Sequence, residues 1–165
     1  MEYQHLSHTF EPIYDNHSKI LILGSFPSVK SREQQFYYGH PQNRFWKVLS
    51  TILQCECPKT ITQKKQLLLD NYIAVWDVIA ECDIIGSSDS SIKNVKVNPL
   101  NQILNECEIR KIYVNGATAA KLYRNYSQVQ TKRECVQLPS TSPANAAYSI
   151  ERLCEQWTAI MEALV

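Results

Sequence analysis

The sequence predicts an α/β fold, a three-layer α/β/α sandwich with a short, mostly parallel four-stranded central sheet. Apolar runs alternate along the chain with segments of helical periodicity, which is the pattern of parallel strands joined by helices. The first run, Lys19–Ser25, is almost entirely apolar, as expected for a central strand that is covered on both faces. The 165 residues, of which 44% are hydrophobic, suit one domain spanning residues 1–165.

The other elements follow in order along the chain. The remaining predicted strands are Tyr72–Trp76, Arg110–Asn115 and Cys135–Leu138, and the predicted helices are Gln42–Leu53, Thr60–Asp70, Leu100–Cys107, Ala117–Tyr126 and Ala146–Leu164. The Gly, Ser and Asp content of Asp83–Ser91 predicts a loop. In open parallel sheets a ligand binds beyond the carboxyl ends of the strands. We therefore expect a site at the two loops that follow strands, Phe26–Pro41 and Pro139–Asn145.

Composition limits the possible functions only loosely. A net charge of +1 argues against a strongly basic DNA-binding surface, although a local basic patch suffices for phosphate contact. No apolar run is long enough to span a bilayer, and residues 1–10 lack the apolar core of a signal peptide, so we expect a cytoplasmic protein without membrane contact. Basic residues near the two loops are Lys30, Arg32, Arg44, Lys47, Lys132 and Arg133.

The six cysteines predict neither disulfides nor a metal centre. In a cytoplasmic chain, thiols within apolar or helical patterns are best interpreted as free and buried. Cys55 and Cys57 have the wrong spacing for zinc or an iron–sulfur cluster, and no second pair lies nearby. A dinucleotide cofactor is disfavoured because no G-x-G-x-x-G follows the first strand. We expect no metal and no cofactor.

Three motifs carry the functional interpretation. A GSFPS turn spans residues 24–28, a YYGHPQNRFW block spans 37–46, and an LPSTSPAN segment spans 138–145. Together they resemble the uracil-DNA glycosylase superfamily, and in particular its hypoxanthine-DNA glycosylase (DNA-deoxyinosine glycosylase) branch. The resemblance extends in order from Lys19 to the terminal helix and includes Val75–Val78. It implies a single uracil-DNA-glycosylase-like domain.

The resemblance implies a monofunctional DNA glycosylase that removes deaminated bases, above all hypoxanthine, in base excision repair. Such an enzyme takes the base out of the stack and holds it in a pocket. Its partner is DNA that contains a deaminated base, and we expect the protein to act as a monomer. No lysine falls within the three motifs, so a lyase step through a Schiff base is not expected.

The first loop is the region that the resemblance places against the flipped base. It puts Gly24, Ser25 and Phe26 at the pocket floor, stacks Tyr38 on the base, and gives His40 a hydrogen bond to the base or to a phosphate. Simpler interpretations stay open, because Phe26 and Tyr38 also suit core packing and the His40 imidazole also suits capping of the backbone.

Asn43 is the residue to which the resemblance assigns catalysis. Its carbonyl oxygen can accept a hydrogen bond from the attacking water, and its amide can contact the base. A cap at the start of the predicted helix is the alternative. In the fast uracil enzymes the position of Phe26 holds a carboxylate, which phenylalanine cannot replace, so slow turnover is expected. Asp77 is expected to cap a helix rather than to catalyse.

Four hydroxyl side chains are assigned to the DNA backbone: Ser28, Ser140, Thr141 and Ser142. They are short donors, and the last three lead toward the terminal helix, whose free amides favour an anion. An ordinary surface turn is the alternative for this loop. The loop lacks the bulky residue with which the fast uracil enzymes fill the vacated duplex, so modest duplex binding is expected.

Two other functions stay open. The preferred lesion could be uracil, as in a uracil or mismatch-specific enzyme of the same superfamily, or xanthine, because pocket size cannot be deduced from short motifs. A non-catalytic nucleic-acid-binding α/β domain is the second alternative. The near-neutral charge and the phenylalanine at position 26 favour that alternative.

Overall fold

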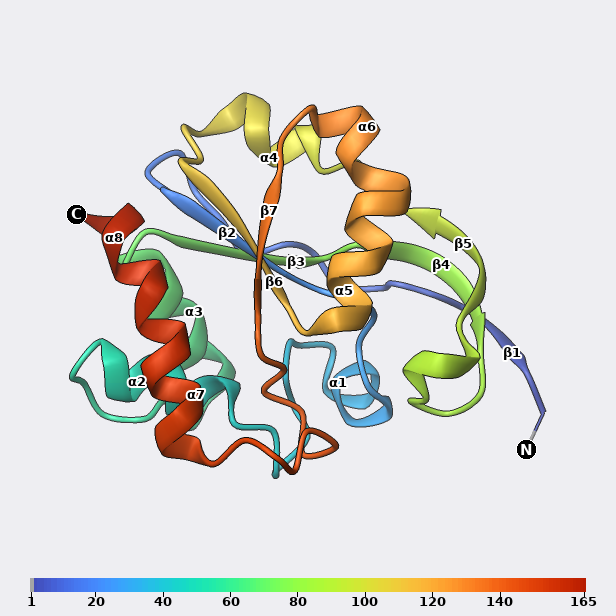
Figure 1. Ribbon diagram of the computed structural model, residues 1–165, viewed down its shortest axis with the longest axis horizontal. Helices are drawn as coiled ribbons and strands as arrows, with labels where there is room; N and C mark the ends of the chain where they lie inside the picture. Colours follow the sequence, from blue (N-terminus) through green and yellow to red (C-terminus); the bar gives the residue numbers. More distant parts are fainter. Residues whose placement is uncertain (1) are drawn as a thin grey trace.

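The computed structural model describes residues 2–165 and contains the predicted parallel sheet, with strand order β3-β2-β6-β7 (Figure 1). The strands are β2 (Ile20–Gly24), β3 (Ile73–Asp77), β6 (Lys111–Asn115) and β7 (Cys135–Leu138). Every residue of β2 and β3 is buried, which explains their unbroken apolar sequences. All four strands are parallel to their neighbours, so their carboxyl ends lie along one edge.

Helices cover both faces of this sheet and complete the three predicted layers (Figure 1). One group consists of α2 (Phe45–Ile52), α3 (Ile61–Asp70) and α7 (Ile150–Trp157). The other side carries α5 (Ala117–Leu122) and α6 (Gln128–Thr131), which a π-helical turn joins, and α4 (Asn101–Glu106) lies beside them. A 3₁₀ turn leads from α7 into α8 (Met161–Leu164) at the end of the chain.

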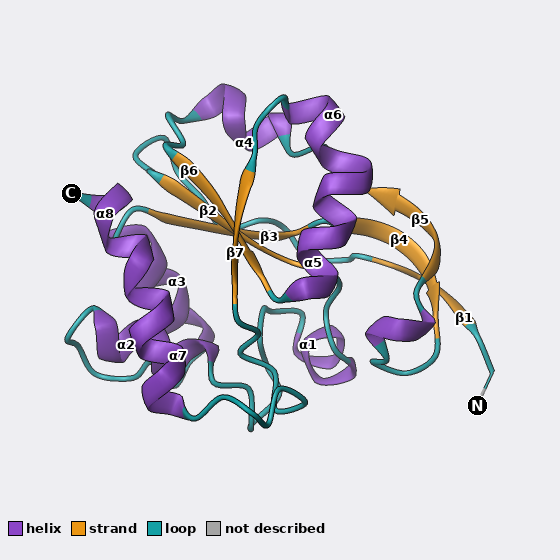
Figure 2. Cartoon of the chain, in the orientation of Figure 1, coloured by secondary structure: helices purple, strands orange, loops and turns teal. Residues whose placement is uncertain are grey.

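A second, antiparallel sheet lies beside the first and was not predicted (Figure 2). Its order is β1-β4-β5, formed by Gln4–Ser7, Ile79–Ile84 and Lys93–Val97. The predicted loop Asp83–Ser91 therefore begins as the end of β4 and finishes with a 3₁₀ turn at Asp89–Ser91. β4 has half-buried polar positions among its apolar ones, so it gives no continuous apolar run.

Three helix boundaries also differ from the sequence prediction. The loop Phe26–Pro41 contains a short helix, α1 (Val29–Gln34), which starts at the side-chain cap of Ser28. The helix expected from Gln42 begins at Phe45, and the helix expected from Ala146 begins at Ile150. The segment after β7 is therefore a longer loop than predicted, and Ser149 caps the helix that follows it.

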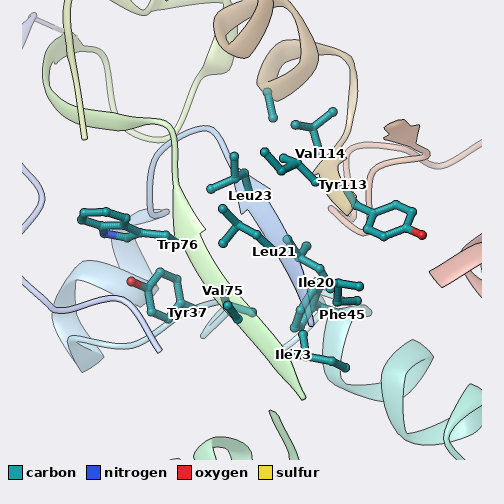
Figure 3. Close-up of a cluster of buried hydrophobic side chains, with 14 of the residues drawn as sticks. Ile20, Leu21, Leu23, Tyr37, Phe45, Ile73, Val75, Trp76, Tyr113 and Val114 are labelled. Atoms are coloured by element: carbon teal, nitrogen blue, oxygen red, sulfur yellow. The ribbon is translucent and has the colours of Figure 1, made fainter. Parts of the chain in front are cut away.

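The core side chains pack on both sides of β2, and β2 ends at the same edge of the sheet as its neighbours β3 and β6. Figure 3 shows Tyr37 and Trp76 on one side of β2 and Tyr113 on the other, with the aliphatic side chains of β2 between them. Gly24 pairs with Asp77 in the register of β2 and β3, and Asn115 ends the neighbouring strand β6. These three residues therefore meet at one edge of the sheet.

The cysteines are free thiols, as predicted, but they are not all buried. Cys82 and Cys107 are buried, whereas Cys55 and Cys57 are exposed. Among residues 2–165, no helix combines the length and the apolar character needed to cross a membrane.

Candidate active site

A cavity of about 330 Å³ opens at the carboxyl edge of the parallel sheet, where the loops after β2 and β7 meet below the strands in Figure 1. It is lined by all ten residues predicted from the sequence: Gly24, Ser25, Phe26, Ser28, Tyr38, His40, Asn43, Ser140, Thr141 and Ser142. Its lining also includes three polar residues that the sequence interpretation did not assign to the site, Asp77, Asp89 and Asn115. The fold thus brings the three motifs to one place.

Asn43 uses its side-chain carbonyl inside the protein. Its Oδ1 accepts a hydrogen bond from the backbone N–H of Phe45 at 2.9 Å and another from the hydroxyl of Thr141 at 2.9 Å. A carbonyl oxygen has two lone pairs, so both are occupied. The bond from Phe45 is a cap at the start of the helix, which was the alternative role predicted for Asn43 from the sequence. What remains for a ligand is the amide Nδ2, which is a donor.

The side chains of Asn115 and Thr141 hold Asn43 in this orientation. Asn115 donates from Nδ2 to Thr141 Oγ1 at 3.0 Å, and its Oδ1 accepts the backbone N–H of Thr141 at 3.0 Å. Thr141 then donates its hydroxyl proton to Asn43. Each of these contacts pairs a donor with an acceptor. The chain of bonds therefore fixes which end of the Asn43 amide faces the cavity.

Thr141 differs from its predicted role as a contact of the DNA backbone. The residue has 0% exposure, and its hydroxyl is engaged on both sides by amides. A group buried in this way has no surface to offer a phosphate. The structure gives Thr141 the role of positioning Asn43.

Arg44 ties the two motif loops together. Its guanidinium donates to the carbonyls of Ser142 at 2.9 Å and Asn145 at 3.0 Å, and also to that of Tyr148. Its backbone N–H donates to the carbonyl of Thr141 at 3.0 Å. Arginine suits this role because its fork offers five donors in a fixed geometry. The same contacts occupy donors of a guanidinium that the sequence placed near a possible basic patch.

Tyr38 occupies the cavity in a strained conformation. Its φ is +52°, in the left-handed region that non-glycine residues rarely adopt. Phe45 stacks on one face of its ring with centroids 3.9 Å apart, so only the opposite face can meet a flipped base. Its hydroxyl is buried and has no partner among residues 2–165, and burial raises its pKa, which keeps it protonated. Its neighbour Tyr37 is a core residue that donates to the carbonyl of Glu11.

Asp77 lines the cavity and is paired with the buried side chain of His8. The two side chains are 5% and 2% exposed, and His8 Nε2 lies 2.9 Å from Asp77 Oδ2. The other carboxylate oxygen lies only 2.5 Å from the point where a Cβ on Gly24 would stand, so glycine is required there for space. Asp77 ends β3 and no helix follows it, so the predicted helix cap is wrong.

Phe26 is both core and wall. It is 9% exposed, packs edge-on against His8, and lies 5.8 Å below the guanidinium of Arg32. Arg32 donates to the carbonyls of Pro27 and Gly86, so this arginine also braces loops. Phe26 therefore fits both roles predicted from the sequence, packing in the core and lining the pocket.

Asp89 reaches the cavity from the second sheet. It begins the 3₁₀ turn between β4 and β5, and its Oδ1 accepts a hydrogen bond from Ser25 Oγ at 3.2 Å. The residue is exposed, but its carboxyl end lies within the cavity lining, where burial raises its pKa. Ser87 of the same loop accepts the N–H of Val29. Sequence analysis placed this segment in a loop and did not assign it to the site.

The other predicted donors are partly engaged by the backbone. Ser28 caps α1 by accepting the N–H of Ser31, and Ser140 accepts the N–H of Ser142. His40 Nδ1 accepts the N–H of Gln42, which is the capping alternative foreseen from the sequence, and its Nε2 has no partner among residues 2–165. These side chains therefore line the cavity with only part of their hydrogen-bonding capacity free.

Comparison with known proteins agrees with the motifs and the fold. The family model of the uracil DNA glycosylase superfamily matches residues 11–164, so the chain belongs to this superfamily. It is similar to a protein of Methanosarcina acetivorans named hypoxanthine DNA glycosylase, at 33% identity over 92% of this chain and 95% of that protein. A protein of Methanosarcina barkeri with the same name is 37% identical over 54% of this chain and 57% of that protein.

The fold has a solved counterpart. A solution NMR structure of a candidate uracil DNA glycosylase from Methanosarcina acetivorans superposes with a TM-score of 0.79 and 32% identity, covering 94% of this chain and 96% of that chain. The predicted α/β fold and the predicted superfamily are therefore confirmed.

Proposed function

We propose that this chain is a monofunctional DNA glycosylase that hydrolyses the N-glycosidic bond of deaminated bases in DNA, with hypoxanthine in deoxyinosine as its main substrate. The observation that carries the proposal is the cavity at the carboxyl edge, where three motifs of a superfamily member converge. Similarity to two proteins named hypoxanthine DNA glycosylase supports the choice of lesion. The cavity volume of about 330 Å³ lies within the range of small-molecule sites.

Asn43 is the residue that we assign to the chemistry. Negative charge develops on the base as the glycosidic bond breaks, and a fixed donor aimed at that base stabilises the transition state. The free Nδ2 of Asn43 is such a donor, and its orientation is set before the substrate binds. Asn43 thus acts by holding the departing base rather than by accepting a proton from water.

The other predicted residues hold the substrate in the proposed complex. The exposed face of Tyr38 stacks on the base, Gly24, Ser25 and Phe26 line the floor, and His40 donates from Nε2. Ser28, Ser140 and Ser142 lie at the rim, where hydroxyl and backbone donors suit the DNA backbone. No lysine lines the cavity among residues 2–165, which supports hydrolysis without a lyase step.

The proposed cellular setting follows from the same features. We propose that the protein acts as a monomer, with the ten predicted site residues lining one cavity of a single chain. Six free thiols suit a reducing compartment, so we propose the cytoplasm.

The test is a strand-cleavage assay on labelled oligonucleotides that carry deoxyinosine, deoxyuridine or deoxyxanthosine, in duplex and single strand, followed by alkali. We expect cleavage at deoxyinosine, and we expect Asn43→Ala to lose at least about 100-fold of the rate, as for removal of one transition-state donor. Cleavage only at uracil would keep the superfamily and change the substrate. Folded protein that cleaves none of the three would leave a nucleic-acid-binding domain as the better description.

A further inference from the structure

We propose that Asp89 is the carboxylate that activates the attacking water in this enzyme. The inference rests on the proposed glycosylase function and adds a residue to it. Asp89 is supplied by the turn between β4 and β5, outside the three motifs that define the site.

The hydrolysis needs a proton acceptor, and none of the ten predicted site residues is a carboxylate. A water molecule attacks a carbon of the sugar, and its proton must be taken up by a nearby acceptor. Asn43 Oδ1 already accepts two hydrogen bonds, and Phe26 has no acceptor at all. The carboxylates that line the cavity are Asp77 and Asp89. The group that accepts the proton of the water is therefore expected to be one of these two carboxylates.

Depth in the cavity separates the two carboxylates. A flipped nucleotide enters base first, so its sugar and the attacked carbon stay near the mouth while the base fills the interior. Asp77 is deep: its side chain is 5% exposed, one oxygen is bonded to His8, and the other is pressed against Gly24. Asp89 is an exposed residue on a surface turn whose carboxyl end joins the lining. In the proposed complex, Asp89 is therefore accessible both to water and to the sugar of the flipped nucleotide.

The hydrogen bond from Ser25 places the carboxylate beside the first motif. Ser25 Oγ donates to Asp89 Oδ1 at 3.2 Å, and Ser25 directly precedes Phe26, the position at which a carboxylate would be expected. The turn that carries Asp89 is held to α1 by the contact of Ser87 with Val29 and by that of Arg32 with Gly86. A carboxylate from the second sheet thus compensates for the phenylalanine of the motif.

The water oxygen forms a bond to C1′ while the bond from C1′ to N9 of hypoxanthine breaks and its electron pair leaves with the base. One proton of the water moves to the free carboxylate oxygen of Asp89 and is later released to solvent, and the base takes a proton from solvent. The products are free hypoxanthine and an abasic site.

The electrostatic surroundings keep this carboxylate a useful base. Burial raises the pKa of Asp89, the Asp77 carboxylate raises it further, and hydrogen bonds from Ser25 and Thr118 offset part of the rise. Arg32 approaches the turn, but through the Gly86 carbonyl. The ion pairs among residues 2–165 involve other carboxylates. Because the base form is needed, activity must fall as the pH drops through this raised pKa.

The experiment measures single-turnover cleavage of a deoxyinosine duplex by wild type, Asp89→Asn and Asp89→Ala across a pH series. Asp70→Asn is the matched control, because Asp70 is exposed on α3 and bonds only to Gln66. We expect Asp89→Asn to lose about 100-fold or more, the usual contribution of a general base, and to lose the acid limb of the pH profile. We expect added formate to restore part of the Asp89→Ala rate and the control to match wild type.

A binding measurement separates chemistry from folding and docking. A duplex carrying 2′-fluoro-2′-deoxyinosine, which resists cleavage, should bind Asp89→Asn as tightly as wild type or more tightly, because one negative charge is removed. Wild-type cleavage with Asp89→Asn within a few-fold of it and an unchanged acid limb would overturn the assignment of Asp89. Wild type that cleaves no lesion would overturn the proposed function, and this inference with it.

Discussion

The two walls of the cavity differ in their chemistry. One wall, formed by Asn43, Asn115 and Thr141, is neutral and its side chains bond to one another. The other wall, formed by Asp77 and Asp89, carries carboxylates. Cleavage of an N-glycosidic bond also separates charge, because negative charge develops on the base and positive charge develops on the sugar. The difference between the walls teaches that the proposed donor and the proposed acceptor belong to separate groups of side chains.

The largest expected effect comes from making the neutral wall acidic. Asn43→Asp keeps the oxygen that accepts hydrogen bonds from Phe45 and Thr141. It replaces the donor of this side chain, the Nδ2 amide, with a negatively charged oxygen. We expect single-turnover cleavage of deoxyinosine to fall at least about 100-fold, as for loss of a transition-state donor. Asn43→Ala is the matched comparison, and its expected loss of at least about 100-fold isolates the effect of removing the donor without adding a charge. If Asn43→Asp were faster than wild type, Asn43 would be an acceptor for water.

A smaller effect is expected at Gly24, which lies beside the carboxylate wall at Asp77. A Cβ in Gly24→Ala would lie 2.5 Å from Asp77 Oδ1 and 3.0 Å from the Tyr38 hydroxyl, so buried groups must move. We expect a loss of about 1–3 kcal/mol in the free energy of unfolding in urea, the usual cost of overpacking. Cleavage should fall about tenfold or more because the floor is displaced.

Gly39→Ala is the control for that substitution. Its Cβ would meet the end of the Gln34 side chain at 2.6 Å, and this flexible side chain can move away. We expect near wild-type stability. Equal losses for Gly24→Ala and Gly39→Ala would show that the close approach at Gly24 has no special importance.

The smallest effect is expected from the link within the neutral wall. Thr141→Val keeps the shape of a fully buried side chain but removes the hydroxyl between Asn115 and Asn43. We expect roughly 1–3 kcal/mol lower stability, because two buried partners lose a hydrogen bond. The cleavage rate should fall only several-fold, and Thr141→Ser should recover most of it. A rate like that of Asn43→Ala would instead make Thr141 part of the chemistry.

The sequence predicted the central sheet better than the second sheet, for a physical reason. β2 is buried at every position, so its composition alone identifies it. β1 is polar and largely exposed, and it exists because it pairs with β4, which lies more than 70 residues away. Such pairing leaves little trace in local composition. α1 was missed as well, because six mostly polar residues cannot show helical periodicity.

The candidate site divides in the same way. The GSFPS and LPSTSPAN motifs line the cavity because each begins at the last residue of a parallel strand, and the YYGHPQNRFW block lies in the connection that follows β2. Asp89 reaches it from a turn of the unpredicted sheet, and His8, the partner of Asp77, follows β1 of that sheet, so no local pattern indicated these two residues. The direction of the Asn43 amide also depends on partners almost 100 residues away. Roles that depend on such distant contacts require the folded structure.

The buried contact between His8 and Asp77 affects where the domain can be cut. The family match begins at residue 11, after His8 and the strand β1. A polypeptide trimmed to the matched residues would keep every motif, yet it would expose the Asp77 carboxylate and leave the edge of β4 unpaired. Recombinant versions should therefore begin upstream of Gln4, and an affinity tag is better placed at the carboxyl terminus, where Val165 is 91% exposed.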